Sequence, residues 1–182
     1  NIVVFLGLDI STSITGATLI DDIGQIMYCE AWDMRNKNHF PDLYDKANFV
    51  KGRLLDLRGM YLIEHVFIEQ SLQAFRPGFS SAKTLLTLAS FNGIVSYICQ
   101  DELGIKPEYI GASTARKSNG IKIPRGEKAK KVVLQYVLDN ELDFVVEYTK
   151  QENPKPGSYD RADSLIIARA GYNLWKEKNS NS

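Results

Sequence analysis

Cysteine is scarce in this chain of 182 residues, because Cys29 and Cys99 are its two cysteines and lie far apart in the sequence. They form neither a disulfide framework nor a CxxC pair, which fits a protein of a reducing compartment. The 13 glycines and 6 prolines follow no period, so a collagen-like or low-complexity chain is excluded. No apolar run approaches the ~18 residues that a membrane span requires. Because the N-terminus also lacks a charged leader, we expect a cytoplasmic protein without a membrane partner.

Three common catalytic signatures are also missing. The chain has no HExxH zinc motif, no GxSxG nucleophile elbow and no GxxxxGK phosphate-binding loop. Its two histidines, His39 and His65, have no partners at ligand-like spacing, and we expect both to be ordinary surface or strand-edge residues. Zinc hydrolysis, serine hydrolysis and P-loop chemistry therefore have no support in the sequence.

Positive charge is concentrated in one stretch, although the chain as a whole is neutral, with 22 basic and 22 acidic residues. Between positions 116 and 131, Glu127 is the one acid among seven cations, so this stretch carries a charge of +6. The seven cations are Arg116, Lys117, Lys122, Arg125, Lys128, Lys130 and Lys131. This asymmetry predicts an anion-binding face, with a solvated helix face as the alternative.

Hydrophobic periodicity predicts an α/β fold with a mixed sheet. Short apolar runs rich in β-branched residues indicate strands, and apolar residues spaced by three and four indicate helices. We expect strands at 2–10, 17–20, 25–32, 66–68 and 105–110, and helices at 43–57, 80–103, 127–138 and from about 160 onward.

The order of these elements predicts how the sheet is built. The first three strands follow one another through short turns and should form an antiparallel meander, and crossovers should add the other two strands. The result is a five-stranded mixed sheet with helices on both faces. Residues 142–148 fit either a strand or a helix. We expect one domain over residues 1–178 and a frayed tail at 179–182.

Four acids stand where a packed domain does not normally place them. Asp9 interrupts the most hydrophobic predicted strand, and Glu69 follows directly on the apolar residues 66–68 of another predicted strand. Asp160 and Asp163 lie three positions apart at the start of a helix, which puts both on one face. Buried carboxylates are costly unless a cation compensates them, and no Lys or Arg lies within three residues of Asp9 or Glu69.

A divalent metal site explains the four acids together. Taken singly, each has a structural explanation: Asp9 can cap a turn, and Asp160 and Asp163 are favoured types at a helix N-terminus. As a set they predict Mg²⁺ ligation, with Mn²⁺ as a substitute, because Mg²⁺ binds a few carboxylates and leaves positions for phosphate oxygens. Two such ions per site can activate a water and stabilise the leaving oxygen of a phosphodiester.

Three segments around these acids resemble the motifs of RuvC-type Holliday-junction resolvases, in the ribonuclease H-like superfamily. Residues 7–16 (GLDISTSITG) are similar to the first-strand motif, 67–70 (FIEQ) to the second and 160–165 (DRADSL) to the third, in the same order and over nearly the whole chain. Two features depart from the family. Ile10 and Ser11 stand where Pro-Gly is common, and the loop after Glu69 is longer, which suits a divergent, phage-type member.

The resemblance implies a ribonuclease H-like sheet and a homodimeric, Mg²⁺-dependent endonuclease that cuts two opposed strands of a four-way DNA junction. It implies that the four acids are catalytic metal ligands. It also implies that the cations at 116–131 contact backbone phosphates, and that Phe75 and Arg76 approach the junction centre. The predicted helix 80–103 is a candidate dimer interface, and its stripe is Leu85, Leu88, Ala89, Asn92 and Ser96. Packing of this stripe on the sheet is the alternative.

Three other functions remain open at this level. An ATP-binding protein of the actin and sugar-kinase class opens with a similar strand and turn to residues 9–13, although such kinases need two copies of the fold. A catalytically silent nucleic-acid-binding module would leave the four acids unexplained. Another ribonuclease H-like nuclease, acting on flaps or on RNA–DNA hybrids, would use the same acids for the same chemistry.

Overall fold

The computed structural model describes residues 2–70 and 81–180. The strands and helices follow one another in the order that the sequence predicts, with one additional short helix. The elements are β1 (Val4–Asp9), β2 (Ile14–Asp21), β3 (Ile26–Asp33), α1 (Leu43–Met60), β4 (Ile63–Glu69), α2 (Ala82–Leu103), β5 (Glu108–Ile110), α3 (Ala112–Ser118), α4 (Ala129–Asn140) and α5 (Ser158–Ser180).

The five strands form one mixed sheet in the order β3-β2-β1-β4-β5, which confirms the predicted fold class. β1, β2 and β3 pair antiparallel, as expected for strands joined by short turns. β4 pairs parallel with β1, and β5 pairs parallel with β4. The carboxyl ends of β1, β3, β4 and β5 therefore lie at one edge of the sheet, which is also the edge where β2 begins.

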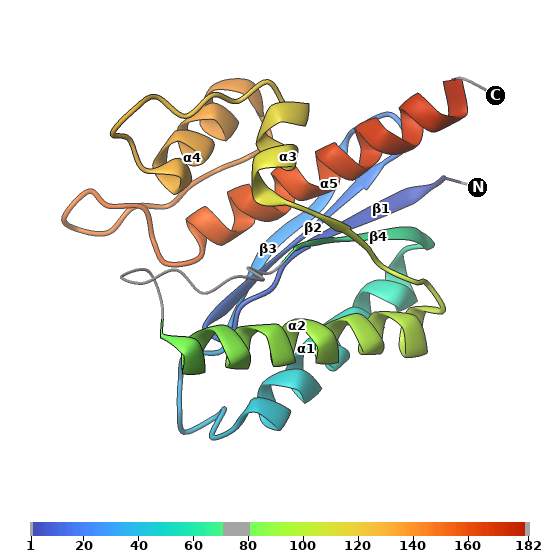
Figure 1. The fold of residues 1–182 in the computed structure, drawn as a ribbon, viewed down its shortest axis with the longest axis vertical. Helices are drawn as coiled ribbons and strands as arrows, with labels where there is room; N and C mark the ends of the chain where they lie inside the picture. Colours follow the sequence, from blue (N-terminus) through green and yellow to red (C-terminus); the bar gives the residue numbers. More distant parts are fainter. Residues whose placement is uncertain (1, 71–80, 181–182) are drawn as a thin grey trace.

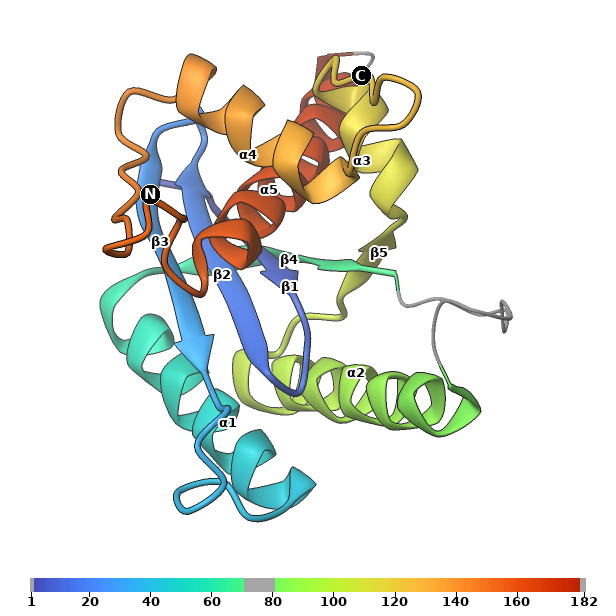
Figure 2. The same cartoon turned by 90° about the vertical axis from the view of Figure 1, so that its left-hand side faces the viewer.

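Helices cover both faces of the sheet (Figure 1). α1 and α2 pack on one face, and α3, α4 and α5 lie on the other, with α5 running along β1 and β2 (Figure 2). The alternation of side chains in β1 separates two cores: Leu6 and Leu8 point toward α1 and α2, whereas Phe5 points toward α5. Because Gly7 and Asp9 share the parity of Phe5, they also lie on the α5 face.

α5 lies against the backbone of the sheet because glycines leave room for it. A Cβ placed on Gly16 of β2 would be 2.0 Å from the carbonyl oxygen of Asp160, and one on Gly7 of β1 would be 2.5 Å from the amide nitrogen of Ala168. Farther along the helix, a Cβ on Gly171 would be 2.2 Å from the ring of Phe67. These close approaches fix the depth of α5 along its length, including the turn that carries Asp160.

Three local predictions differ from the structure. The basic stretch is not one loop and one helix, because residues 112–118 form α3 before α4 begins. Residues 142–148 are neither strand nor helix and make only an isolated bridge, between Tyr148 and Pro154. α5 begins at Ser158 and continues to Ser180, so the first two residues of the predicted tail are helical. Each difference concerns a segment too short for hydrophobic periodicity to be informative.

Among the described residues, no helix combines the length and the apolar character needed to cross a membrane.

Candidate active site

The two strand acids meet at the carboxyl edge of the sheet. Asp9 is the last residue of β1, and Glu69 is the last residue of β4, its parallel neighbour. Phe67 belongs to the core under α5, so Glu69, two positions later, faces α5 as Asp9 does. The Glu69 side chain lies close enough to Asp9 for its charge to raise the pKa of Asp9. The backbone at Glu69 is also held, because the side-chain amide of Asn92 in α2 donates to its carbonyl oxygen over 3.4 Å.

The two helix acids reach the same place from the first turns of α5. Gly16 pairs with Asp9 across the β1–β2 ladder and also receives the backbone of Asp160, so the strand acid and the helix turn meet at one glycine. Asp163 follows one turn later on the same face. The structure thus brings together all four acids that the sequence singled out.

Arg161 stands between the two helix acids and points the other way. Its Nε donates to the carbonyl of Cys29 in β3 over 3.0 Å, and its Nη1 donates to the carbonyl of Val145 over 2.9 Å. The guanidinium also stacks 4.5 Å from the ring centroid of Phe144. Arg161 therefore ties the first turn of α5 to the edge strand and to the 142–148 segment, and this holds the acids on the sheet side.

The pKa values of three carboxyl groups in the site, those of Asp9, Asp160 and Asp163, are raised. Burial raises the pKa of Asp9 well above its usual value of 3.8, and the charges of Glu69, Asp163 and Asp160 raise it further. Burial, followed by the charges of Glu69 and Asp160, raises the pKa of Asp163 to about 7. Burial also raises the pKa of Asp160. Each of these carboxyl groups is held near like charges in a poorly solvated place, which is costly without a cation.

The donor set fits a hard divalent cation. All four groups offer carboxylate oxygens, which Mg²⁺ and Mn²⁺ favour, and their mutual repulsion is what a bound cation would remove. Within the described part of the chain, no three acidic, histidine or cysteine side chains already stand at metal-binding separation.

Two of the seven predicted cations lie near enough to the acids for their charges to lower the pKa values of those acids. Arg116, in α3, and Lys130, in α4, both lower the pKa of Asp163, and Lys130 also lowers that of Asp160. The ammonium of Lys130 lies 5.0 Å from the ring centroid of Tyr159, at the start of α5. One side of the site is therefore positively charged, because α3 and α4 fold back onto α5.

For the other described residues that are predicted to contact DNA, the structure records no effect on the four acids. Lys122 and Lys131 line a cavity of about 370 Å³ between the α3–α4 connection and α4, together with Glu127 and Asp139. Nothing in the structure tests the phosphate contacts of Lys117, Arg125 and Lys128, and these stay predictions. Phe75 and Arg76 lie outside the described residues.

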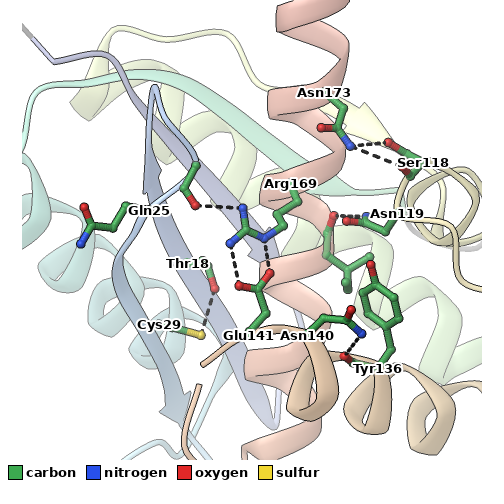
Figure 3. Close-up of polar contacts among 12 residues, drawn as sticks. Thr18, Gln25, Cys29, Ser118, Asn119, Tyr136, Asn140, Glu141, Arg169 and Asn173 are labelled. Carbon is green, nitrogen blue, oxygen red and sulfur yellow. Dashed lines mark hydrogen bonds and ion pairs between the residues drawn. The ribbon is translucent and has the colours of Figure 1, made fainter. Parts of the chain in front are cut away.

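Polar contacts hold α4 and α5 in register (Figure 3). The Arg169 guanidinium of α5 forms a bidentate pair with the Glu141 carboxylate at the end of α4, and its Nη1 donates to the Gly24 carbonyl over 2.9 Å. From α3 the Asn119 amide donates to the Ile166 carbonyl over 3.1 Å. Because α3 and α4 carry Arg116 and Lys130, these contacts also position the two cations beside the acids.

α2 divides into two halves. Asn92 and Ser96, two residues of the predicted interface stripe, are buried inside the protein, and the Ser96 hydroxyl donates to the Asn92 carbonyl over 2.7 Å. They are therefore not free to meet a partner, which favours the alternative that this part of the stripe packs inside the protein. The first half of α2 is largely exposed, with Leu86 69% accessible and Ala89 also at the surface.

One functional candidate escaped the sequence analysis. Arg35, in the loop after β3, lies close enough to the site for the charge of Asp160 to act on it. A weak signal was present, because Asp33 and Arg35 form an acid–base pair directly after a strand. The pair lies near the acids because β3 ends at the same sheet edge as β1, and this depends on the topology of the sheet.

Comparison with solved structures relates this fold to junction resolvases. The chain is similar to Thermus thermophilus RuvC in complex with a Holliday junction substrate, with a TM-score of 0.66, 14% identity and 96% of each chain covered. It is also similar to the Thermus thermophilus RuvC structure, with a TM-score of 0.63 and 18% identity, and 96% of each chain is covered. A third similar structure is the yeast mitochondrial Holliday junction resolvase Ydc2, with a TM-score of 0.62 and 14% identity. The match covers 97% of this chain and 80% of Ydc2. No protein-family model and no curated protein matches the sequence. The ribonuclease H-like fold predicted from the motifs is thereby confirmed.

Proposed function

We propose that this protein is a structure-selective DNA endonuclease that resolves four-way (Holliday) junctions by metal-dependent hydrolysis of phosphodiester bonds. The observation that carries the proposal is the meeting of Asp9, Glu69, Asp160 and Asp163 at one sheet edge. It occurs in a fold shared with a RuvC that was solved with a Holliday junction substrate. Metal binding accounts for four partly buried like charges that would otherwise only destabilise the fold.

In this proposal the four acids hold Mg²⁺ or Mn²⁺, two ions per site. The metal, when bound, supplies an activated water and stabilises the leaving oxygen. The chain supplies the positions of the carboxylates: two strand ends set Asp9 and Glu69, and the glycine-backed docking of α5 sets Asp160 and Asp163. Because Asp163 has a pKa of about 7, its carboxyl group must give up its proton before it can act as a ligand.

In the same proposal, the basic residues near the four acids bind the DNA backbone. Arg116 and Lys130 lie beside Asp163 and can receive the phosphates that flank the scissile bond. They also keep Asp163 closer to its ionised form in the free protein. The other five basic residues of the 116–131 stretch extend the predicted phosphate-binding face, and Phe75 and Arg76 remain the predicted contacts to the junction centre.

Resolution of a junction requires two nicks, so we include a homodimer in the proposal. A twofold dimer matches the pseudo-symmetry of a four-way junction. The exposed first half of α2, with Leu86 and Ala89, supports an interface there, because a helix half with apolar side chains in water gains by packing against another copy. Sedimentation at micromolar protein should give twice the chain mass, and Leu86→Glu should give the monomer mass.

The decisive experiment offers four synthetic substrates under the same conditions: a four-way junction, a flap, a linear duplex and an RNA–DNA hybrid. With Mg²⁺ we expect paired nicks in the junction and none with Asp9→Asn, whose carboxamide cannot replace the ligand charge. Preferential cutting of flaps or hybrids would assign the same site to another ribonuclease H-like nuclease. Cleavage that persists in Asp9→Asn, or a chain that cuts none of the four substrates, would refute the proposal.

A further inference from the structure

The loop after β3 carries two exposed cations, Arg35 and Lys37, and begins at the sheet edge where the acids lie. β3 runs in the same direction as β1, because both pair antiparallel with β2. Gly16 of β2 pairs with Asp9 on one side and with Ala31 on the other, so the three residues lie in one row across the sheet. Two strand spacings of ~4.8 Å then place β3 about 10 Å from β1. Figure 2 shows the loop after β3 leaving the same edge of the sheet as the β1–β2 turn.

The start of this loop is fixed in place. The backbone amide of Met34 donates to the carbonyl of Ser13 in the β1–β2 turn over 2.8 Å, and the Met34 side chain is fully buried. The β1–β2 turn is itself held by α1, because the ammonium of Lys46 donates to the Thr12 carbonyl. Arg35 therefore projects from a rigid base, although residues 35–39 are exposed.

Arg35 carries a guanidinium that is already arranged for an oxyanion. Its Nε donates to Asp33 Oδ1 over 2.9 Å and its Nη2 to Asp33 Oδ2 over 2.7 Å, so the fork holds one carboxylate with two bonds. Both side chains are about half exposed, at 50% and 49%. An exposed ion pair contributes little to stability, so a partner of similar shape can replace the carboxylate at small cost. A backbone phosphate has that shape, since two of its oxygens match the same fork.

We propose that Arg35 binds a backbone phosphate of the DNA on the β3 side of the active site, exchanging Asp33 for that phosphate when substrate enters. Lys37, two residues later and exposed, continues this surface. The scissile strand then crosses the four acids between two positive borders, Arg116 and Lys130 on one side and Arg35 on the other. The inference rests on the proposed function and adds the direction in which the strand leaves the site.

The proposal predicts that substitutions of Asp33 and of Arg35 change DNA binding in opposite directions. In the free protein Asp33 occupies the fork and adds a negative charge where DNA must approach. Asp33→Asn removes that charge and releases Arg35, so binding should tighten. Arg35→Gln removes the contact, so binding should weaken. A pair that only stabilises the loop predicts instead that both substitutions act in the same direction, or not at all.

The test measures binding of a synthetic four-way junction by the full chain without metal, at several salt concentrations. One phosphate contact contributes close to 0.9 to the slope of log K against log salt. Arg35→Gln should therefore make the slope shallower by about 0.9 and weaken binding up to about eightfold at 0.1 M salt. Arg58→Gln is the matched control, because Arg58 is also an exposed, ion-paired arginine but lies in the last turn of α1, beside Glu102.

The outcomes separate this inference from the proposed function. If the unaltered chain cuts junctions and Arg35→Gln binds them with the slope of Arg58→Gln, the phosphate contact is refuted while the junction resolvase stands. If Asp33→Asn weakens binding as much as Arg35→Gln does, the exchange of Asp33 for phosphate is refuted. If the unaltered chain neither binds nor cuts a junction, the proposed function itself has failed.

Discussion

Asp163→Asn should stabilise the metal-free protein, and the size of the effect follows from the site. Folding raises the pKa of Asp163 from an ordinary value of 3.8 to about 7, through burial first and then the charges of Glu69 and Asp160. A carboxyl whose pKa is higher in the folded state favours the fold at low pH. This contribution is lost as the pH rises from about 3.8 to about 7. At 1.36 kcal/mol per pKa unit the loss approaches about 4 kcal/mol above pH 7.

The assay is thermal unfolding of Asp163→Asn and of the unaltered chain between pH 3.5 and pH 8. For a chain of this length 1 kcal/mol moves the Tm by about 2–4 °C, so the variant should melt about 8–16 °C higher at pH 8. At pH 3.5 the difference should become small, because the carboxyl is then protonated in the folded state and mostly protonated in the unfolded state. Asp143→Asn, at an exposed position after α4, is the control and should show no such pH dependence.

Metal should reverse this order of stabilities. Saturating Mg²⁺ binds the folded state and should raise the Tm of the unaltered chain more than that of Asp163→Asn, which has lost a ligand. The reasoning is refuted if the variant is no more stable than the unaltered chain at pH 8. It is equally refuted if the advantage of the variant persists unchanged at pH 3.5, because a repacking effect would then explain it.

Two further predictions concern how the site is built. Gly16→Ala should destabilise the fold by about 1–3 kcal/mol in chemical denaturation and reduce cleavage strongly, because the new Cβ would lie 2.0 Å from the carbonyl oxygen of Asp160 and displace the first turn of α5. Gly52→Ala, in α1 with open space around it, should instead stabilise by about 0.5–1 kcal/mol, and equal losses in both variants would contradict the argument. Replacing Arg116 and Lys130 by Gln should make the salt slope of junction binding shallower by about 2. Because both cations lower the pKa of Asp163, the pH of half-maximal cleavage should rise, and an unchanged pH profile would place them away from the reacting site.

The sequence alone determined the architecture and the identity of the acids. The nearly continuous apolar run of β1 and the period of three and four in α1 predicted the sheet and its covering helices, because both patterns are local features of the sequence. The acids at 9, 69, 160 and 163 stood out for an equally local reason. Asp9 and Glu69 interrupt or end an apolar run, where a charge is unfavourable without compensation, and Asp160 and Asp163 share one face at the start of a helix.

Tertiary structure alone decided how the acids meet and what surrounds them. The parallel register of β1 and β4, and the docking depth of α5 on Gly16, come from contacts between residues distant in the chain. For the same reason neither Arg161 nor Arg35 could be assigned a role in advance. Arg161 sits between two acids in sequence yet points away from them, and Arg35 reaches the site because β3 and β1 end at one edge. Local patterns specify elements, but the approach of charges across a sheet edge depends on which strands lie side by side.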